Sequence, residues 1–167
     1  RTPPTPLVSI VIPCYVATAK HAELLDGTLH TVGAQTCRDF EIVVVDDGSP
    51  LDVRAITARH AGTVTLRQAN GGPAVARNSG IRVSRGQYFV FLDADDRLKP
   101  GAIAALCAGI SGPEVVAVYG DYERIDENGV KIGRRNLIRR REKPDGFILQ
   151  PLLGGNFIVN GGIMLVR

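Results

Sequence analysis

The 167-residue sequence contains no apolar run close to the roughly 20 residues that a membrane-spanning helix needs. Its first residues, RTPPTP, resemble neither a secretory signal peptide nor a lipidation motif. Because the chain starts at Arg1 without a methionine, we expect it to be part of a longer protein. With 44% hydrophobic and 22% charged residues, it has the composition of one globular domain with a real core.

Cysteine is scarce, and its spacing excludes two further classes of protein. Cys14, Cys37 and Cys107 are widely separated and form no CxxC or Cys/His pattern. A disulfide framework and a zinc site both need closer or paired spacings. The cysteines therefore predict reduced and mostly buried thiols, as in a cytoplasmic protein.

The standard phosphate-binding motifs are also absent, since neither G-x-G-x-x-G nor G-x-x-x-x-G-K-[ST] occurs. The turn NGGP, which begins at Asn70, still has glycines that let the backbone approach a ligand, and Pro73 suits the start of a helix. One turn into that helix, Arg77 can reach phosphates or pair with Asp47 or Asp93. A purely structural ion pair is the alternative for Arg77.

Apolar runs and helical periodicities alternate along the chain. Strands are expected at residues 7–12, 40–45, 63–67 and 88–92, and helices at 21–35, 53–60, 73–83 and 102–110. Pro13 is expected to stop the first strand. Such alternation predicts a parallel sheet covered by helices on both faces. A further strand is expected at 114–119, a hairpin turn at 127–129, a short helix at 147–153 and strand pieces at 157–159 and 163–166.

Polar residues gather where the expected parallel strands end. They are Pro13 to Tyr15, Asp46 and Asp47, Asn70 and Gly71, and Asp93 to Asp96. Ligands of parallel sheets bind beyond the carboxyl ends of the strands. The sequence therefore predicts a ligand site at this edge.

The stretch QYFVFLDADD is the most distinctive of these ends. Its apolar part is expected to be a strand buried on both faces, and it runs into Asp93, Asp95 and Asp96. Adjacent carboxylates repel one another unless a cation or strong donors hold them, and D-x-D is a spacing that suits Mg²⁺ or Mn²⁺ with diphosphate oxygens. The alternative is a cluster that caps a helix near Leu98-Lys99-Pro100.

Five segments, VSIVIPCY, TLHTVGAQT, FEIVVVDDGS, NGGPAVARNSGI and GQYFVFLDADD, resemble in order and spacing the family 2 glycosyltransferases with the GT-A fold. The resemblance is close from Leu7 to Leu106 and loose beyond. It implies an α/β fold, a Rossmann-like three-layer α/β/α sandwich with a mainly parallel mixed sheet. It also implies a single domain over residues 1–167, apparently truncated at its C-terminus, with a nucleotide-binding half at 1–110 and the start of an acceptor-binding half at 111–167.

The resemblance implies roles for the residues at the strand ends. Pro13, Cys14 and Tyr15 would hold the base and ribose, Asp47 would accept a hydrogen bond from a base N–H, and Asn70, Gly71 and Arg77 would border the base and diphosphate. Within Asp93, Ala94 and Asp95, Asp93 would contact ribose or a metal-bound water, and Asp95 would bind Mn²⁺ or Mg²⁺ between the phosphates. A metal there would stabilise the charge of the departing nucleoside diphosphate.

The resemblance further implies an inverting glycosyltransferase of polysaccharide or glycoconjugate biosynthesis. The donor would be a nucleotide-diphosphate sugar, a UDP-sugar first, and the acceptor a saccharide or a lipid-linked sugar. The family's catalytic base is expected beyond Arg167, so we expect this chain to bind the donor and to transfer the sugar slowly or only hydrolyse it.

The Arg-rich segment at residues 134–141 lacks interleaved aromatic residues, so we expect no nucleic-acid partner. It is compatible with an anionic acceptor or with peripheral membrane contact of the full-length parent. Two alternative functions remain open. One is a nucleotide-sugar-binding module without turnover. The other is a sugar-phosphate nucleotidyltransferase, for which basic residues should directly follow the first strand, where only the distant Lys20 is found.

Overall fold

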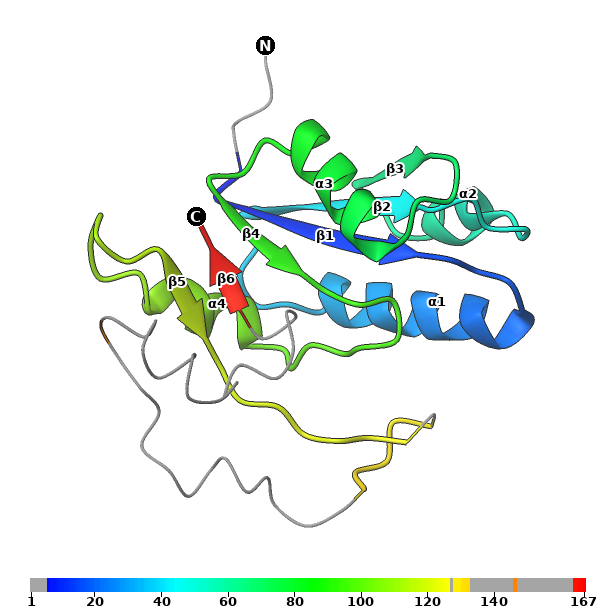
Figure 1. Cartoon of the computed structure of the whole chain (residues 1–167). Coiled ribbons are helices and arrows are strands. Elements are labelled where there is room, and N and C mark those ends of the chain that lie inside the picture. Colours follow the sequence, from blue (N-terminus) through cyan, green and yellow to red (C-terminus); the bar gives the residue numbers. More distant parts are fainter. Residues whose placement is uncertain (1–5, 127, 133–145, 147–163) are drawn as a thin grey trace, which may run out of the picture.

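The structure is a computed structural model that describes residues 6–126, 128–132, 146 and 164–167. Within this part the elements are β1 (Val8–Cys14), α1 (Ala19–Gly33), β2 (Phe40–Asp46), α2 (Val53–Thr57), β3 (Thr63–Arg67), α3 (Pro73–Val83), β4 (Tyr88–Phe91), α4 (Ala102–Ala108), β5 (Ala117–Tyr119) and β6 (Met164–Val166). The strands form a six-stranded sheet in the order β3-β2-β1-β4-β6-β5. Figure 1 shows β1 at the centre of this sheet.

The sheet is mixed but mainly parallel, as the sequence predicts. β1 pairs in parallel with both β2 and β4, and β2 pairs in parallel with β3. β6 is antiparallel to β4 and to β5, so it alone reverses the strand direction among the described strands. The carboxyl ends of β1 to β4 therefore meet at one edge.

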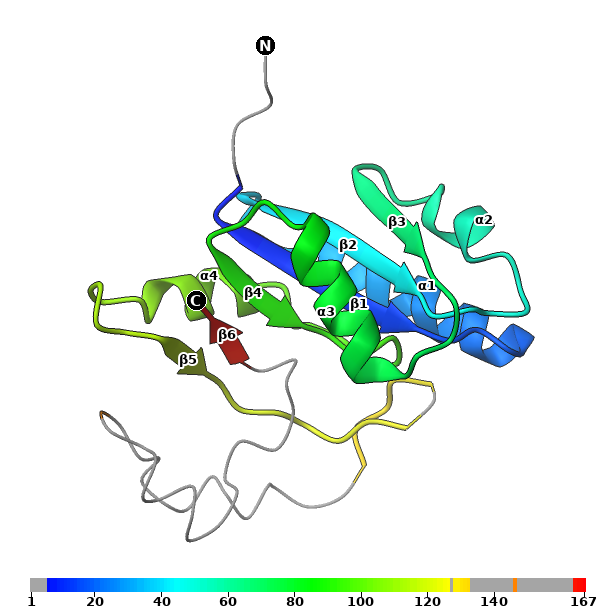
Figure 2. The same cartoon turned by 45° about the horizontal axis from the view of Figure 1, so that its top comes forward.

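The strands divide their side chains between two helical layers. Ile10, Ile12 and Val44 lie in a core with α1 and α2, whereas Val11 and Val45 lie in a smaller core with Ala76 of α3. Figure 1 shows α1 and α3 on opposite faces of the sheet, and Figure 2 shows α3 lying over β1, where it packs against β1 and β2. This alternation is the period-two pattern of a strand buried on both sides, and the result is the predicted three-layer α/β/α arrangement.

Pro13 does not stop β1, contrary to the expectation from the sequence. It pairs with Val45 in register, and the strand continues to Cys14. Odd residues of β1 direct their backbone groups toward β4, where Leu92 N–H donates to Val11 O at 3.0 Å. Pairing between β1 and β4 ends at Val11 and Phe91. Because no ladder bond is required at position 13 on that side, a proline is tolerated there.

β4 is fully buried on only one face, so the expectation of burial on both faces is wrong. Tyr88 and Val90 are buried, while Phe89 and Phe91 on the α3 side are half-buried. Their rings stack at a centroid distance of 6.3 Å. Among the described helices only α3 lies on this face, and it packs against β1 and β2 rather than β4, so both rings stay partly exposed.

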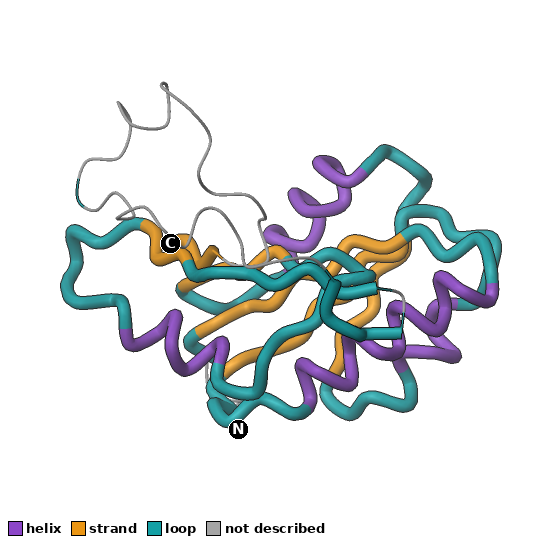
Figure 3. The backbone as a smooth tube through the Cα atoms, turned by 90° about the horizontal axis from the view of Figure 1, so that it is seen from below, coloured by secondary structure: helices purple, strands orange, loops and turns teal. Residues whose placement is uncertain are grey.

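The remaining expected elements agree with the structure within a few residues, except that α2 and β5 are shorter than expected. The hairpin turn is confirmed by an antiparallel bridge between Ile125 and Lys131, with Gly129 at φ +82°. The Arg-rich segment, the helix at 147–153 and the strand piece at 157–159 lie outside the described residues. Figure 3 shows the strands in orange, with their twist, among the helices and loops.

None of the helices in the described part of the chain is long and apolar enough to cross a membrane. All three cysteines are free thiols, as expected, with Cys14 buried and the other two half-buried.

Candidate functional site

A cavity of about 360 Å³ lies beyond the carboxyl ends of β1, β2 and β4, and we call it the Arg77 cavity. Its lining is Pro13, Cys14, Tyr15, Asp47, Pro73, Ala76, Arg77, Asp93, Ala94 and Asp95. Every residue to which the family resemblance gives a role lines this cavity, apart from Asn70 and Gly71. Three strand ends and the first turn of α3 therefore meet where the sequence predicts a ligand site.

Asp47 fastens the loop that leads from β3 to α3. Its Oδ1 accepts hydrogen bonds from Gln68 Nε2 at 2.7 Å and from Gly71 N at 2.9 Å, and its Oδ2 accepts from Gly72 N at 2.8 Å. Burial raises the pKa of Asp47, but these three hydrogen bonds outweigh burial and hold the pKa below its usual value. Asp47 is thus an ionised carboxylate that shapes one wall of the cavity.

Asn70 and Gly71 contribute to this wall through the loop rather than through the cavity lining. Asn70 Nδ2 donates to Asp47 O at 3.0 Å. A Cβ at Gly48, whose φ is +76°, would lie 2.9 Å from Asn70 N, so the two loops approach each other too closely for another residue. Gly72, with φ +85°, is the N-cap of α3. The glycines therefore set the path that brings Arg77 over the strand ends.

Arg77 and Asp93 face each other across the cavity. Arg77 Nη2 lies 2.6 Å from Asp93 Oδ1, and both side chains remain partly exposed, at 33% and 42%. Of the two partners that the sequence offered for Arg77, the structure brings Asp93 and not Asp47 into contact. The guanidinium neutralises the Asp93 charge and holds its carboxylate in one orientation.

Asp95 differs from both of these carboxylates. It is exposed, and within the described residues its carboxylate makes no hydrogen bond or ion pair. Metal-ligand groups of three or more His, Cys, Asp or Glu side chains are likewise absent from the described part of the chain. A site for Mg²⁺ or Mn²⁺ in nucleotide chemistry needs only one or two protein carboxylates, because phosphate oxygens and water complete the shell. Asp95 fits that role.

Polar residues of α1 form hydrogen bonds with the backbone of the turn that carries Asp95. Thr28 Oγ1 lies 2.9 Å from Ala94 O and 2.8 Å from Asp96 O, and it is fully buried. One turn on, Thr31 Oγ1 accepts from Leu98 N at 3.1 Å. Hydrophobic periodicity predicts this helix from its apolar residues alone, so it did not reveal Thr28 and Thr31 as part of the site.

Gln35 completes the same polar row and is also buried. It donates to Lys99 O at 2.8 Å and accepts from Ile103 N at 3.0 Å. Thr28 and Thr31 lie on α1, and Gln35 follows its C-cap Ala34 by one residue. The i, i+3, i+7 spacing of these three polar residues was the signal available in the sequence. The alternative of a helix-capping Asp cluster is wrong, because α4 begins only at Ala102 and its N-cap is Gly101.

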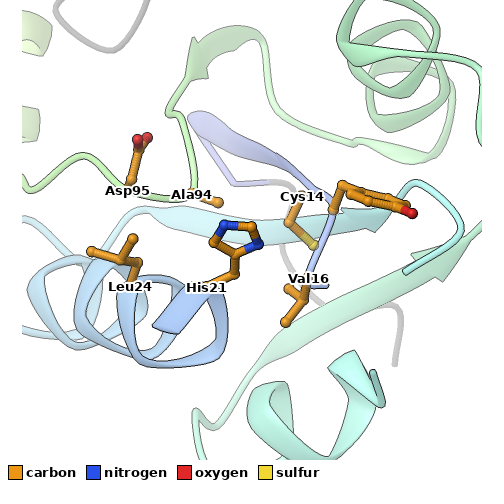
Figure 4. A pocket seen from close by; sticks show the side chains of 7 residues that line it. Cys14, Val16, His21, Leu24, Ala94 and Asp95 are labelled. Atoms are coloured by element: carbon orange, nitrogen blue, oxygen red, sulfur yellow. The ribbon is translucent and has the colours of Figure 1, made fainter. Parts of the chain in front are cut away.

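Cys14 lies between the Arg77 cavity and a second cavity of about 230 Å³, which we call the His21 cavity. Figure 4 shows the labelled residues of this second cavity, with the His21 ring between Cys14 and Val16 on one side and Leu24 and Asp95 on the other. Burial, with the nearby charges of Asp46 and Asp47, raises the pKa of Cys14 to about 12. The thiol is therefore protonated at neutral pH, which makes it a poor nucleophile.

A mainly parallel sheet with charged residues gathered at its carboxyl edge defines the class of α/β proteins that bind a ligand beyond their strand ends. The sequence profile described as glycosyl transferase family 2 matches residues 9–167. The chain belongs to this family.

Curated relatives are named as glycosyltransferases. The uncharacterized glycosyltransferase EpsJ of Bacillus subtilis strain 168 is 41% identical over 54% of this chain and 26% of its own length. Glycosyltransferase GlyG of Streptococcus pneumoniae serotype 4 is 32% identical over 73% of this chain and 41% of its own. The chain thus spans less than half the length of either relative.

Solved structures share the fold. S. aureus TarS 1-349, in complex with UDP-GlcNAc, superposes with a TM-score of 0.73 at 20% identity over 96% of this chain and 45% of that one. The mannosyltransferase PcManGT from Pyrobaculum calidifontis, in complex with GDP-Man and Mn²⁺, gives a TM-score of 0.63 at 24% identity over 73% of this chain and 37% of that one. The fold is therefore of the GT-A type, as the sequence resemblance implied.

Proposed function

We propose that this domain binds a nucleotide-diphosphate sugar together with Mn²⁺ or Mg²⁺ and forms the donor site of an inverting glycosyltransferase. The observation that carries the proposal is the state of the three aspartates around the Arg77 cavity. Asp47 accepts hydrogen bonds from its own loop, and Asp93 forms an ion pair with Arg77. Asp95 is the exposed carboxylate that has no partner in the described residues. A single uncommitted carboxylate at a strand end is suited to one cation bridged to a diphosphate.

The residues around the cavity divide the binding of the donor among them. The exposed ring of Tyr15 and the wall formed by Asp47 suit a planar base. Arg77, with Asp93, faces the space in which the ribose and phosphates would lie. A cation on Asp95 would offset the negative charge of the leaving diphosphate. Pre-positioned charge of this kind acts where charge develops as the glycosidic bond breaks.

The general base of transfer is assigned to no described residue. Glu123 is held by two lysines and Asp93 by Arg77, so neither is free to accept a proton from an acceptor hydroxyl. The saccharide or lipid-linked acceptor, a role in polysaccharide biosynthesis, and a cytoplasmic, membrane-associated parent protein are further proposals that follow from the family.

The test is calorimetry of UDP binding in the presence of Mn²⁺. UDP is the first probe, since the TarS structure was solved with a UDP-sugar. We expect measurable binding by the chain and at least a tenfold loss in Asp95→Ala, equivalent to about 1.4 kcal/mol. As a matched control, Glu114→Ala removes an exposed glutamate far along the chain and should leave affinity unchanged.

Equal UDP binding by the chain and Asp95→Ala would overturn the metal assignment. UDP release from UDP-sugars would support the transferase. Pyrophosphate release from nucleoside triphosphate and sugar phosphate would support a nucleotidyltransferase instead. UDP binding with no release in either assay would favour a binding module.

A further inference from the structure

A third cavity, of about 390 Å³, adjoins Asp95 beneath the hairpin bridged at Ile125 and Lys131, and we call it the hairpin cavity. Its lining joins Leu24 of α1, Asp95 and Asp96, and hairpin residues 122–126 and 132. Leu24 and Asp95 also line the His21 cavity, and Asp95 lines the Arg77 cavity as well. Asp95 therefore lies where the three cavities meet, and a ligand with its diphosphate at Asp95 can extend from the Arg77 cavity into either of the other two.

Two carboxylates of the hairpin cavity hold the hairpin in place. Glu123 lies 2.9 Å from Lys131 Nζ and 3.1 Å from Lys99 Nζ. Hydrogen bonds from these two lysines lower the pKa of Glu123 to about 2. Asp126 Oδ1 accepts hydrogen bonds from Asn128 N and Val130 N, at 2.9 and 2.8 Å. We call these contacts of Glu123 and Asp126 the clamp. Through Lys99, the clamp fixes the 122–126 backbone against the segment that follows Asp95.

Arg124 lies between these two clamped residues and lines the same cavity. In the part of the chain that the structure describes, its side chain makes no ion pair and no hydrogen bond. Its neighbours Glu123 and Asp126 already have their own donors, so neither needs the guanidinium. Arg124 is thus a cation in the same cavity as Asp95 that has no partner among the described residues, and it is available to a ligand.

We propose that the hairpin cavity receives the sugar ring of the nucleotide-diphosphate sugar and that Arg124 reads its hydroxyl groups. The inference rests on the donor binding proposed above, because the sugar is bonded to the phosphate that a cation on Asp95 would hold. A guanidinium donates to two neighbouring oxygens at once, which matches adjacent hydroxyls of a pyranose. Carboxylate oxygens of the lining accept hydrogen bonds from hydroxyls, and Leu24 and Ile132 offer apolar surface to the ring.

The His21 cavity is the less suitable side for a sugar. It is smaller, at about 230 Å³, and most of its lining is apolar. His21 Nδ1 already accepts a hydrogen bond from Ala17 N at 3.3 Å, which leaves Nε2 as the ring nitrogen for a ligand. A polyhydroxylated ring loses several hydrogen bonds to water on entering a site, and the polar hairpin cavity replaces more of them.

The test compares two affinities for each variant, measured by calorimetry with Mn²⁺ present. The probes are UDP and UDP-GlcNAc, with GDP and GDP-mannose as a second pair. Arg124→Gln should raise the ratio of the Kd for the nucleotide sugar to the Kd for the nucleotide about tenfold, the loss of one charge-assisted contact, and leave the Kd for the nucleotide unchanged. Arg124→Lys should lie between, because it retains charge without the fork of donors.

Two controls accompany the test. Arg54→Gln removes an exposed arginine of α2 and should leave both affinities unchanged. The melting temperature of each variant should equal that of the unmodified chain. His21→Gln should leave the ratio unchanged.

The proposal is overturned if Arg124→Gln leaves the ratio unchanged, if His21→Gln changes it instead, or if Arg124→Gln weakens nucleotide and nucleotide sugar equally. The last result would place Arg124 on the diphosphate. Binding of neither nucleotide nor nucleotide sugar by the unmodified chain would overturn the donor site itself, and with it this inference.

Discussion

Carboxylates at the carboxyl edge of the sheet differ in how many hydrogen-bond donors surround them. Asp46, which is almost fully buried, accepts from Ser49 N at 2.8 Å and pairs with Arg67 at 2.6 Å. Asp47 has three donors, whereas Asp95 has none in the described residues. The sequence predicted that aspartates would gather at the strand ends. It could not predict which are consumed by their own loops, because that depends on backbone N–H groups whose positions the loop path decides.

At the amino edge, Glu41 is the corresponding structural carboxylate. It accepts from Ser9 Oγ at 2.7 Å, from Arg85 Nε at 3.0 Å and from Arg85 N. Burial raises its pKa, but these hydrogen bonds and the Arg85 charge outweigh burial and lower the pKa from 4.5. Glu41 therefore joins β1, β2 and the turn before β4 far from the cavities.

Glu41→Gln should lower the free energy of unfolding by about 2 kcal/mol at pH 7, measured by urea denaturation. Because the pKa of Glu41 is lower in the folded chain than in the unfolded chain, its contribution is complete above the unfolded value. It is lost as pH falls through the folded value, so the difference between the two proteins should shrink below about pH 4. Glu114→Gln, at an exposed position, is the control. A difference that stays constant down to pH 3 would contradict this account.

At the scale of elements, α1 serves two purposes that a simple amphipathic pattern does not separate. Leu25, Leu29 and Val32 are buried in the core, Thr28 is buried beside them, and Gln35 is buried just after the helix ends. Thr28 bonds the backbone of the Asp95 turn, and Gln35 bonds the backbone of the segment between that turn and α4. Hydrophobic periodicity predicted the helix, but a threonine or glutamine on a helix appears solvent-facing until its partner strand is known.

Gly80 decides how closely α3 approaches the sheet. A Cβ at this position would lie 2.4 Å from Val11 Cγ1 and 3.2 Å from Val45 Cγ2. Gly80→Ala should therefore destabilise the chain by about 1–3 kcal/mol and shift α3, with Arg77 on it, away from the strand ends. The melting temperature and the affinity for UDP should therefore both fall.

Gly33→Ala is the matched control, since a Cβ at the last residue of α1 would contact nothing within 4 Å. Alanine is the better helix former, so this variant should be as stable as the unmodified chain or about 0.5 kcal/mol more stable. An equal loss of stability and UDP affinity in both variants would show that the close approach of α3 to Val11 does not cause the effect of Gly80→Ala.

At the scale of the whole molecule, the alternation of strands and helices predicted the parallel sheet and the edge at which its cavities lie. The same alternation could not predict that β6 lies antiparallel between β4 and β5. β5 and β6 are three residues each and far apart in sequence, so their position depends on non-local pairing with β4. The division of the chain at residue 110, the site roles and the metal stay predictions.

The central claim is that a divalent cation joins Asp95 to the diphosphate of a bound donor. Anomalous diffraction from a crystal of the chain grown with UDP and Mn²⁺ tests it most directly. We predict a manganese peak within coordination distance of an Asp95 carboxylate oxygen and of the diphosphate. The base should lie in the Arg77 cavity. A diphosphate bound with its manganese remote from Asp95 would contradict the account.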